Sequence, residues 1–417
     1  MNDKLPFNEE KLKSIIKNHP TPFHIYDEEG IISNARRFND AFGILSGFIN
    51  YFAIKALPNP AIMKILFREG FGVDCSSMSE LLLAEKIGIT GENIMFSSND
   101  TPAEEFMKAR ELEAIINLDD ITHIEFLEKS AGMPEVICFR YNPGNLKKGN
   151  GIIGNPTEAK YGFTRKQIFE GYGIAKQKGA KRFGLHTMVA SNELDSAYFI
   201  ETADILFDLV LKVNKKLGIK MEFVNLGGGI GIPYRKEQVA VNYEEVAEGI
   251  HKLYENKILK NKLKTKIFME CGRVITGPYG YLITKVLHLK NTHKKYVGCD
   301  ASMADLMRPA IYGAYHHITV LGKESEKEGH CYDITGSLCE NNDKFAIDRM
   351  LPKIDVGDLL VIHDTGAHGH SMGFNYNGKL RSAELLLRTD GSVLEIRRAE
   401  TVDDYFGTIN FRALESI

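Results

Sequence analysis

The lysine in the segment YFAIKALPNP (51–60) is the first residue whose type and position could do chemistry. Lys55 ends an apolar, strand-like run, and a Pro-Asn-Pro turn follows shortly after it. A lysine at the end of a buried strand costs desolvation free energy unless a partner pairs with it or a reaction uses it. In a partly dry pocket, a lysine can act as an amine nucleophile and form a Schiff base.

The segment NLGGGIG (225–231) is a candidate phosphate-binding loop. Consecutive glycines let backbone N–H groups approach an anion closely, although a tight turn with no ligand is the alternative reading. The spacing does not match GxGxxG, which argues against a dinucleotide. A Schiff-base lysine together with a phosphate loop at Gly227, Gly228 and Gly229 predicts pyridoxal 5'-phosphate (PLP) as the cofactor, because PLP is an aldehyde that carries a phosphate.

The segment ECGR (270–273) supplies a carboxylate and a guanidinium three residues apart. PLP withdraws electrons best when its ring nitrogen is protonated, and Glu270 facing that nitrogen would hold the proton. A plain salt bridge between Glu270 and Arg273 is the alternative.

Two further segments carry residues that could recognise a substrate. Arg308 and Tyr312 are four residues apart, which places them on one face of a short helix or turn. Together with Arg273 they could bind a carboxylate, because arginine presents a fork of donors. Cys339 and Glu340 are adjacent in SLCENNDKFA (337–346). Solvated surface residues, and a small buried cysteine, are the alternatives.

The histidine-rich segment HDTGAHGHSMGFNYN (363–377) predicts no metal site. No carboxylate or cysteine completes a recognised metal-ligand spacing around its three histidines: His363, His368 and His370.

The elements that must position these residues alternate between short β-rich runs and longer amphipathic helices. The β-rich runs are 49–56, 71–77, 93–99, 114–119, 135–143, 183–191, 221–229 and 266–274. Eight strands with a helix in each gap predict an α/β fold, a (β/α)8 TIM barrel. A doubly wound sheet is the alternative, because periodicity does not decide whether a sheet closes. In a barrel, Lys55, the glycine loop and Glu270 would meet at the C-terminal ends of the strands.

The chain after about residue 277 is β-rich, and RTDGS (388–392) predicts a hairpin turn. We therefore expect an N-terminal segment at 1–34, a PLP-binding barrel at 35–277 and a C-terminal antiparallel β domain at 278–417. The segment TPFHIYD (21–27) would add a strand to the β domain. The longest glycine-rich loop spans 144–160.

Composition excludes several other classes of protein. The net charge of −3 and the lack of basic runs argue against nucleic acid and anionic membranes. No apolar run is long enough to cross a bilayer, and the N-terminus has no signal-peptide pattern. The six cysteines form no CxxC pair, so neither zinc nor a disulfide framework is expected. We predict a soluble, cytoplasmic protein that acts on a small molecule.

Taken in order, several segments resemble motifs of the fold type III PLP-dependent decarboxylases, which share a barrel with alanine racemase, and most closely the diaminopimelate decarboxylases. The resemblance covers nearly the whole chain. The matching segments are YFAIKALPNP (51–60), NLGGGIGIPY (225–234), ECGR (270–273), RPAIYGAYH (308–316), CENND (339–343) and NYNGKLRSAELLLR (375–388).

This resemblance implies decarboxylation of meso-2,6-diaminopimelate to L-lysine and CO2, the last step of lysine biosynthesis. It implies that Lys55 forms the Schiff base with PLP, that the three glycines bind the phosphate and that Glu270 pairs with the ring nitrogen. Tyr376 would contact cofactor and substrate.

The resemblance also assigns the substrate's distal end. Arg273, Arg308 and Tyr312 would hold its carboxylate, and Glu340 would bind its amine. Cys339 would donate a proton to the carbanion once CO2 has left. Cys339 and Glu340 would reach the site from a partner subunit, so a homodimer with shared active sites is expected.

One motif departs from the family pattern. The family usually reads HxHIGSQ at the sixth strand, and its second histidine stacks on the cofactor ring. This chain reads HTMVASN (186–192), so His186 matches the first histidine while Met188 occupies the stacking position. A thioether packs against a π-face but offers no imidazole. Ser191 matches the family's serine and would help to bind the phosphate.

Other functions on the same fold remain open from the sequence. The substrate could be carboxynorspermidine, ornithine or arginine, although simple diamine precursors lack the distal carboxylate that the arginines would hold. A racemase fits the CENND and NYN segments less well. A non-catalytic regulator would be expected to lose Lys55 or the glycine loop, and both are present.

Overall fold

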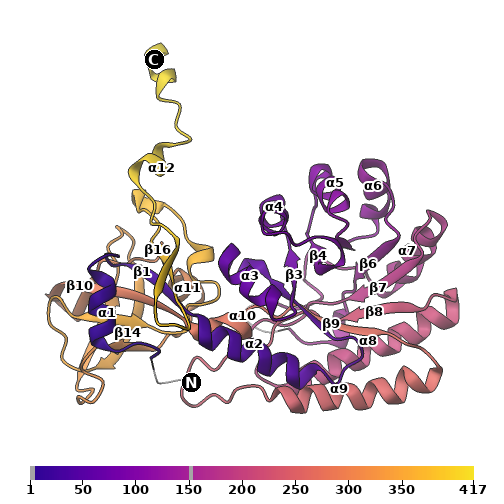
Figure 1. Ribbon diagram of the computed structural model, residues 1–417, viewed down its shortest axis with the longest axis horizontal. Helices are drawn as coiled ribbons and strands as arrows, with labels where there is room; N and C mark the ends of the chain where they lie inside the picture. The colour runs from indigo at the N-terminus through magenta and orange to yellow at the C-terminus, as the bar shows by residue number, and fades with distance from the viewer. Residues whose placement is uncertain (1–4, 150–153) are drawn as a thin grey trace. The chain divides into compact units, whose positions relative to one another are not determined.

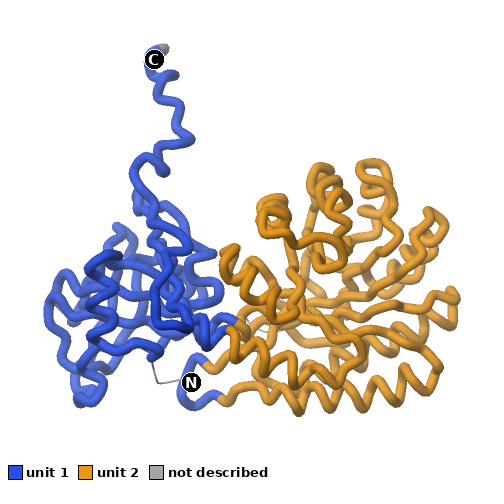
Figure 2. The backbone as a smooth tube through the Cα atoms, in the orientation of Figure 1, with its two compact units in different colours: residues 1–31, 234–238, 276–417 blue, residues 32–233, 239–275 orange. Residues whose placement is uncertain are grey.

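The computed structural model describes residues 5–149 and 154–417. The chain divides into two compact units (Figure 2). We call residues 32–233 and 239–275 the barrel unit, and residues 1–31, 234–238 and 276–417 the β unit.

Eight parallel strands of the barrel unit form a closed barrel (Figure 1). Closure is set by β2 and β9, where Ile49 pairs with Phe268 and Asn50 with Met269. The predicted TIM barrel is confirmed, and the doubly wound alternative is wrong. Each predicted β-rich run overlaps one strand, and β7 begins one residue before its run: β2 (Ile49–Ala53), β3 (Gly72–Cys75), β4 (Ile94–Ser97), β5 (Ile115–Leu118), β6 (Val136–Arg140), β7 (Arg182–His186), β8 (Met221–Asn225) and β9 (Lys266–Met269).

Large inward-facing side chains fill the barrel. The buried cluster consists of Tyr51, Met95, Ile115, Cys138, Phe223 and Phe268. Bulky residues from alternate strands pack in layers in this fold, so the interior is a core rather than a pore. Chemistry is therefore confined to the barrel ends.

Helices with local start signals surround the strands. Asn59 caps α3, Ser77 caps α4, and a Thr164 capping box starts α7. The helices are α2 (Glu28–Phe42), α3 (Pro60–Arg68), α4 (Met78–Lys86), α5 (Ala103–Glu111), α6 (Thr122–Ala131), α7 (Arg165–Gln177), α8 (Ser196–Leu217), α9 (Tyr243–Lys257) and α10 (Arg273–Thr276). Within the described ranges, no helix combines the length and the apolar character that crossing a membrane requires.

The β unit is built on one nine-stranded sheet. Most neighbours are antiparallel, but β1 pairs with β16 and β11 with β13 in parallel, which the long connections between these strands allow. The strands are β1 (Phe23–Asp27), β10 (Gly280–Asn291), β11 (Lys295–Cys299), β12 (Ile318–Val320), β13 (His330–Thr335), β14 (Lys344–Leu351), β15 (Leu359–Ile362), β16 (Ala383–Leu387) and β17 (Val393–Arg397).

The leader and the predicted hairpin both contribute to this sheet. Strand β1 lies between β10 and β16, with Phe23 opposite Ile283 and Ala383. Strands β16 and β17 pair antiparallel across the RTDGS turn, which confirms the hairpin. The helices of the unit are short: α1 (Glu9–Ile16), α11 (Arg308–Tyr312) and α12 (Val402–Phe406).

Candidate active site

A solvent-open cavity of about 340 Å³ lies in the barrel unit. Its lining residues lie at or just beyond the C-terminal ends of the strands, where barrel enzymes place their active sites. The structure brings four of the predicted site residues, Lys55, His186, Met188 and Glu270, into one cavity. The lining is Lys55, Asp74, Ser76, Ser97, Ser98, Asn99, Arg140, His186, Met188 and Glu270.

Lys55 lies in a single 3-10 turn, Ile54–Ala56, which follows β2 directly. Its neighbours Ile54 and Ala56 are buried, whereas Lys55 is exposed. The chain therefore leaves the sheet at Ala53, earlier than the predicted strand end, and the turn directs the amine into the cavity. This placement leaves the lysine accessible to an aldehyde.

Glu270 is a buried carboxylate with a hydrogen bond to each oxygen. Asn225 Nδ2 donates to Oε1 at 2.7 Å, and His186 Nε2 lies 3.0 Å from Oε2. Asn117 Nδ2 lies 2.9 Å from the other ring nitrogen of His186, Nδ1. An amide donor at Nδ1 leaves the proton of the neutral ring on Nε2, so His186 donates to Glu270.

These contacts keep Glu270 ionised. Burial works against the charged form, but the interaction with His186 and the charges of Lys55 and Arg140 together lower the pKa of Glu270 below its ordinary value. A permanent anion at the barrel mouth is the group that a protonated pyridine nitrogen requires.

Asp74, at the end of β3, has a pKa shifted in the opposite direction to that of Glu270. The sequence did not lead us to predict this residue as part of the site. Burial, with the charge of Glu270 second, raises the pKa of Asp74 well above its ordinary value. Its Oδ1 atom is buried and has no hydrogen-bond partner among the described residues. The signal for Asp74 was a charged residue in the apolar run FGVDC (71–75), the same argument that identified Lys55.

The glycine turn is packed too tightly for any other residue. A Cβ atom at Gly227 would lie 2.2 Å from Thr187 O, one at Gly228 2.3 Å from Glu270 O, and one at Gly229 2.5 Å from Ala190 O. Gly227 and Gly229 also have φ values of +70° and +97°, which favour glycine. The backbone is thus held between the loops that follow β7 and β9.

The loop after β7 is hydrogen-bonded to the glycine turn along its length. Gly228 N–H donates to Met188 Sδ at 3.2 Å, and Ile232 N–H donates to Asn192 Oδ1 at 3.0 Å. Glu193 N–H donates to the carbonyl of Gly229 at 2.9 Å. Ser191 is half-buried within this loop. Met188 therefore contacts the turn and lines the cavity at once.

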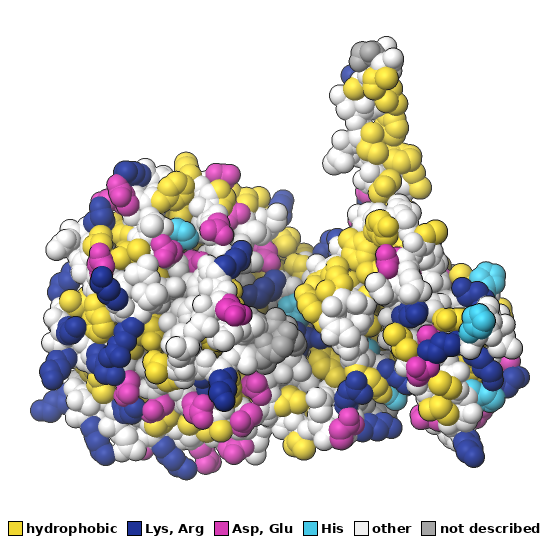
Figure 3. All heavy atoms as spheres, turned by 180° about the vertical axis from the view of Figure 1, so that it is seen from behind, with side chains coloured by type: hydrophobic (Ala, Val, Ile, Leu, Met, Phe, Trp, Pro, Cys, Tyr) yellow, Lys and Arg dark blue, Asp and Glu magenta, His cyan; other side chains and the backbone are white. Residues whose placement is uncertain are grey.

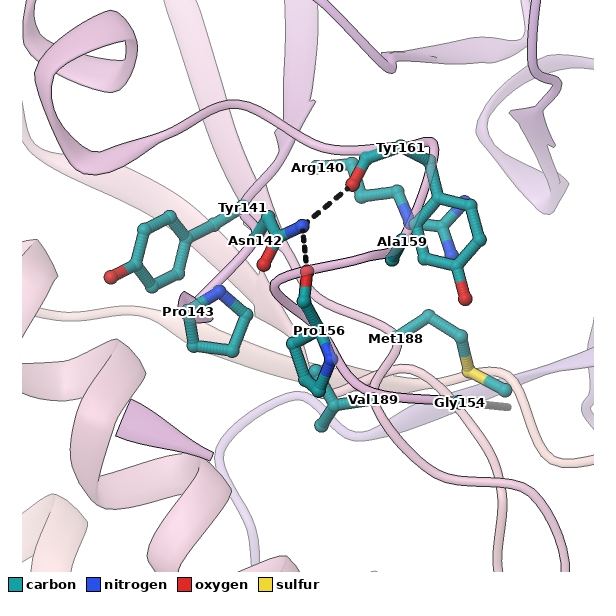
Figure 4. A pocket seen from close by; sticks show the side chains of 10 residues that line it. All are labelled: Arg140, Tyr141, Asn142, Pro143, Gly154, Pro156, Ala159, Tyr161, Met188 and Val189. Carbon is teal, nitrogen blue, oxygen red and sulfur yellow. Dashed lines mark hydrogen bonds between the residues drawn. The ribbon is translucent and has the colours of Figure 1, made fainter. Parts of the chain in front are cut away.

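A second, much smaller cavity of about 10 Å³ shares Arg140 and Met188 with the first (Figure 4). The Arg140 guanidinium lies 3.7 Å from the centre of the Tyr161 ring. Asn142 Nδ2 donates to the carbonyls of Pro156 at 2.8 Å and Tyr161 at 3.0 Å, which fixes this part of the 144–160 loop. Residues 150–153 of that loop lie outside the described residues.

Arg273 begins α10, three residues after Glu270, and is buried. It belongs to the barrel unit, whereas the other predicted substrate residues belong to the β unit.

Within the β unit, Arg308 and Tyr312 share α11 but differ in exposure. Arg308 is buried, donates to the hydroxyl of Tyr234 at 2.9 Å and lies 2.9 Å from Nε2 of His316. Tyr312 is 53% exposed.

Cys339 and Tyr376 are exposed residues of the β unit, and Glu340 beside Cys339 is half-buried. Cys339 N–H donates to Oδ1 of Asn377 at 2.8 Å, which ties the CENND segment to the loop that carries Tyr376.

The residues of the barrel cavity fit PLP. An exposed amine and a buried anion match an aldehyde and a protonated ring nitrogen, and the glycine turn bonded to Met188 is the candidate site for the phosphate. Across the residues that the structure describes, no group of three or more His, Cys, Asp or Glu side chains could hold a metal ion.

Comparisons with known proteins agree with this chemistry. The sequence profile described as "Pyridoxal-dependent decarboxylase, pyridoxal binding domain" matches residues 28–277. Protein TabA of Pseudomonas amygdali pv. tabaci is 42% identical over 97% of this chain and 94% of its own length. The diaminopimelate decarboxylase of Methanothermobacter thermautotrophicus is 35% identical over 92% of this chain and 90% of its own.

A solved structure gives the same picture for the fold. The crystal structure of Methanocaldococcus jannaschii diaminopimelate decarboxylase in complex with L-lysine matches with a TM-score of 0.88 and 33% identity, over 96% of this chain and 95% of the other. This chain therefore belongs to the family of fold type III pyridoxal-dependent decarboxylases, and pyridoxal phosphate is its cofactor.

Proposed function

We propose that this protein decarboxylates meso-2,6-diaminopimelate to L-lysine and CO2, the last step of lysine biosynthesis. The observation that carries the proposal is the cavity in which the amine of Lys55 and the ionised carboxylate of Glu270 lie together. The substrate is supported by relatives that are named diaminopimelate decarboxylases, two of which have been solved with L-lysine. The cytoplasmic location stays a prediction.

The predicted residues in and beside the barrel cavity have separate parts in the reaction. Bound PLP withdraws electrons from the carbon that loses CO2. Lys55 binds its aldehyde, and the glycine turn with Ser191 binds its phosphate. Glu270 holds the proton of the ring nitrogen, and His186 keeps Glu270 in place. Met188, which lines the cavity, would pack against the face of the ring.

Recognition of the substrate's distal end is assigned to Arg273, Arg308, Tyr312, Glu340 and Tyr376. Arg308 is already fixed by Tyr234 and His316, so little side-chain entropy is lost when it binds a carboxylate. A substrate without the distal carboxylate leaves these charges unpaired, which is the basis for selectivity.

The proposed working form is a homodimer in which Cys339 and Glu340 act in the active site of the second copy. Cys339 donates the proton that replaces CO2. Mixing Lys55→Ala with Cys339→Ala tests this, because a mixed dimer holds one site with neither change. Recovery of activity on mixing supports sharing, and no recovery contradicts it.

The decisive experiment measures CO2 and lysine released from meso-diaminopimelate by the PLP-loaded protein. Ornithine, arginine and carboxynorspermidine are run alongside. Lysine formed from meso-diaminopimelate alone is the expected result. Turnover of a comparator instead would reassign the substrate. Lys55→Ala should abolish both turnover and the absorbance band that PLP acquires when bound to the lysine amine, and a retained band would refute the role of Lys55.

A further inference from the structure

The last twenty residues of the β unit form a projecting segment, which we call the C-terminal arm (398–417). It contains α12 and a 3-10 helix, Phe411–Ser416. Large apolar side chains lie along it (Figure 3), and six of them are between 39% and 60% exposed. They are Val402, Tyr405, Phe406, Ile409, Phe411 and Leu414. Contiguous apolar side chains of this kind mark an interaction surface.

The arm has a defined local shape. Thr401 and Asp404 form a capping box at the start of α12, and Arg398 Nη2 donates to Asp404 Oδ1 at 2.8 Å. The rings of Phe406 and Phe411 meet edge to face with centroids 5.4 Å apart. The Arg398–Asp404 pair satisfies two charges within the arm, and beside the exposed Asp403, Arg412 and Glu415 the arm offers a partner its aromatic and aliphatic side chains.

The root of the arm is bonded to the loop that carries Tyr376. Glu400 Oε2 accepts from Asn375 Nδ2 at 2.7 Å and from Arg381 N–H at 2.9 Å. Asn377, which directly follows Tyr376 in that loop, accepts a hydrogen bond from the backbone N–H of Cys339. The arm, Tyr376 and Cys339 therefore belong to one continuous surface of the β unit.

We propose that the C-terminal arm docks on a second copy of this chain and stabilises the dimer in which Cys339 acts. The identity of the partner rests on the proposed function, under which the copy that receives Cys339 covers this surface. In a two-fold dimer each copy offers one arm and receives the other, so both apolar faces are buried. Burying large aromatic and aliphatic side chains is the main source of stability in lasting homodimers.

A tryptophan probe tests where the arm lies, because the chain has no tryptophan of its own. We expect Phe411→Trp holoenzyme to show blue-shifted emission while it is dimeric. Dilution should shift the emission to the red in parallel with the fall in mass measured by sedimentation equilibrium. Emission typical of indole in water at every concentration, from a protein that remains dimeric, would overturn the proposal.

Charged substitutions test how much the arm contributes. Phe406→Asp combined with Leu414→Asp should raise the dimer dissociation constant at least tenfold, and specific activity should recover at high protein concentration. The matched control is Ile44→Asp, an apolar side chain 47% exposed in the loop after α2, which should leave the constant unchanged. Equal dissociation constants for the arm variant and the unmodified protein would contradict docking.

The outcomes separate this inference from the proposed function. A dimer that depends on the arm but does not turn over meso-diaminopimelate would support the arm and refute the substrate. A dimer that turns over meso-diaminopimelate but is indifferent to the arm variants would refute the arm and support the substrate. Full turnover by a monomer would overturn both the shared site and the docking of the arm.

Discussion

Asn225 gives the sharpest test of how the barrel controls the charge of Glu270. Its amide bridges two parts of the site, because Nδ2 donates to Glu270 Oε1 at 2.7 Å and Oδ1 accepts from Gly227 N–H at 2.9 Å. Replacing Asn225 by leucine keeps a similar volume and removes both hydrogen bonds. The carboxylate then loses one of the two donors that favour its charged form.

The size of the effect follows from the bond that is lost. A hydrogen bond to a charged group contributes about 1.5–3 kcal/mol. One pKa unit corresponds to about 1.36 kcal/mol, so the pKa of Glu270 should rise by about 1–2 units in Asn225→Leu. A lowered pKa keeps the carboxylate charged in mild acid, and the variant loses the charge at correspondingly higher pH.

The assay is the affinity of the apoprotein for PLP as a function of pH. On the acid side of this pH profile, protonation of Glu270 weakens PLP binding. This acid limb of the profile should move to a pH about 1–2 units higher in Asn225→Leu. Asn50→Leu is the control, because Asn50 is a buried amide that bonds to the backbone of Cys271 rather than to a carboxylate. It should lower thermal stability without moving the limb. An unmoved limb in Asn225→Leu, or an equal shift in the control, would refute the reasoning.

Three further predictions concern the cofactor site and pH. Met188→Ala should weaken PLP binding about 5–30-fold in an absorbance titration, because about 1–2 kcal/mol of contact free energy is lost. Met188→Leu should change the affinity less than about threefold. Equal effects of the two substitutions would contradict a packing role. Gly228→Ala should abolish PLP binding, because its Cβ would lie 2.3 Å from a carbonyl oxygen, while Gly173→Ala in α7, with nothing within 4 Å, should melt no lower than the unmodified protein. Burial lowers the pKa of His24 and of His363 to about 3. As pH falls from about 6.5 toward 3, the unfolded chain therefore binds up to two more protons than the folded chain, and the free energy of unfolding should fall by up to about 2.7 kcal/mol per pH unit. A melting temperature that stays constant over this range would refute this prediction.

The barrel could be predicted because its strands are short, apolar and separated by helices with clear start signals. Two strands of the β unit could not. Strand β11 (Lys295–Cys299) alternates half-exposed and buried residues, and β14 (Lys344–Leu351) carries Asp348 and Arg349 in its middle. Both strands pair with β13, and this pairing, rather than a β pattern in their own sequence, makes them strands. Strand propensity depends on such neighbours.

In the site, too, residues marked by their neighbours in the sequence could be predicted, whereas residues that depend on partners far along the chain could not. Lys55 and Glu270 stand out because a charged residue ends an apolar run, and the structure places both in one cavity. Asn117 lies 69 residues from His186, its partner, and the barrel register alone brings them together. A lone asparagine in a strand carries no motif. Such partners become visible only when the sheet is closed.

The barrel cavity holds two carboxyl groups whose environments push their pKa values apart. Glu270 has a donor on each oxygen and a lowered pKa, while Asp74 is buried, has an Oδ1 atom with no hydrogen-bond partner among the described residues, and has a raised pKa. Two carboxylates beside one another cannot both carry charge in a low-dielectric site, so ionisation of one favours protonation of the other. Asn225 and His186 decide which one is charged. Reversing that choice would leave a neutral acid where the ring nitrogen needs an anion, which is why the amide of Asn225 matters as much to the chemistry as the carboxylate it holds.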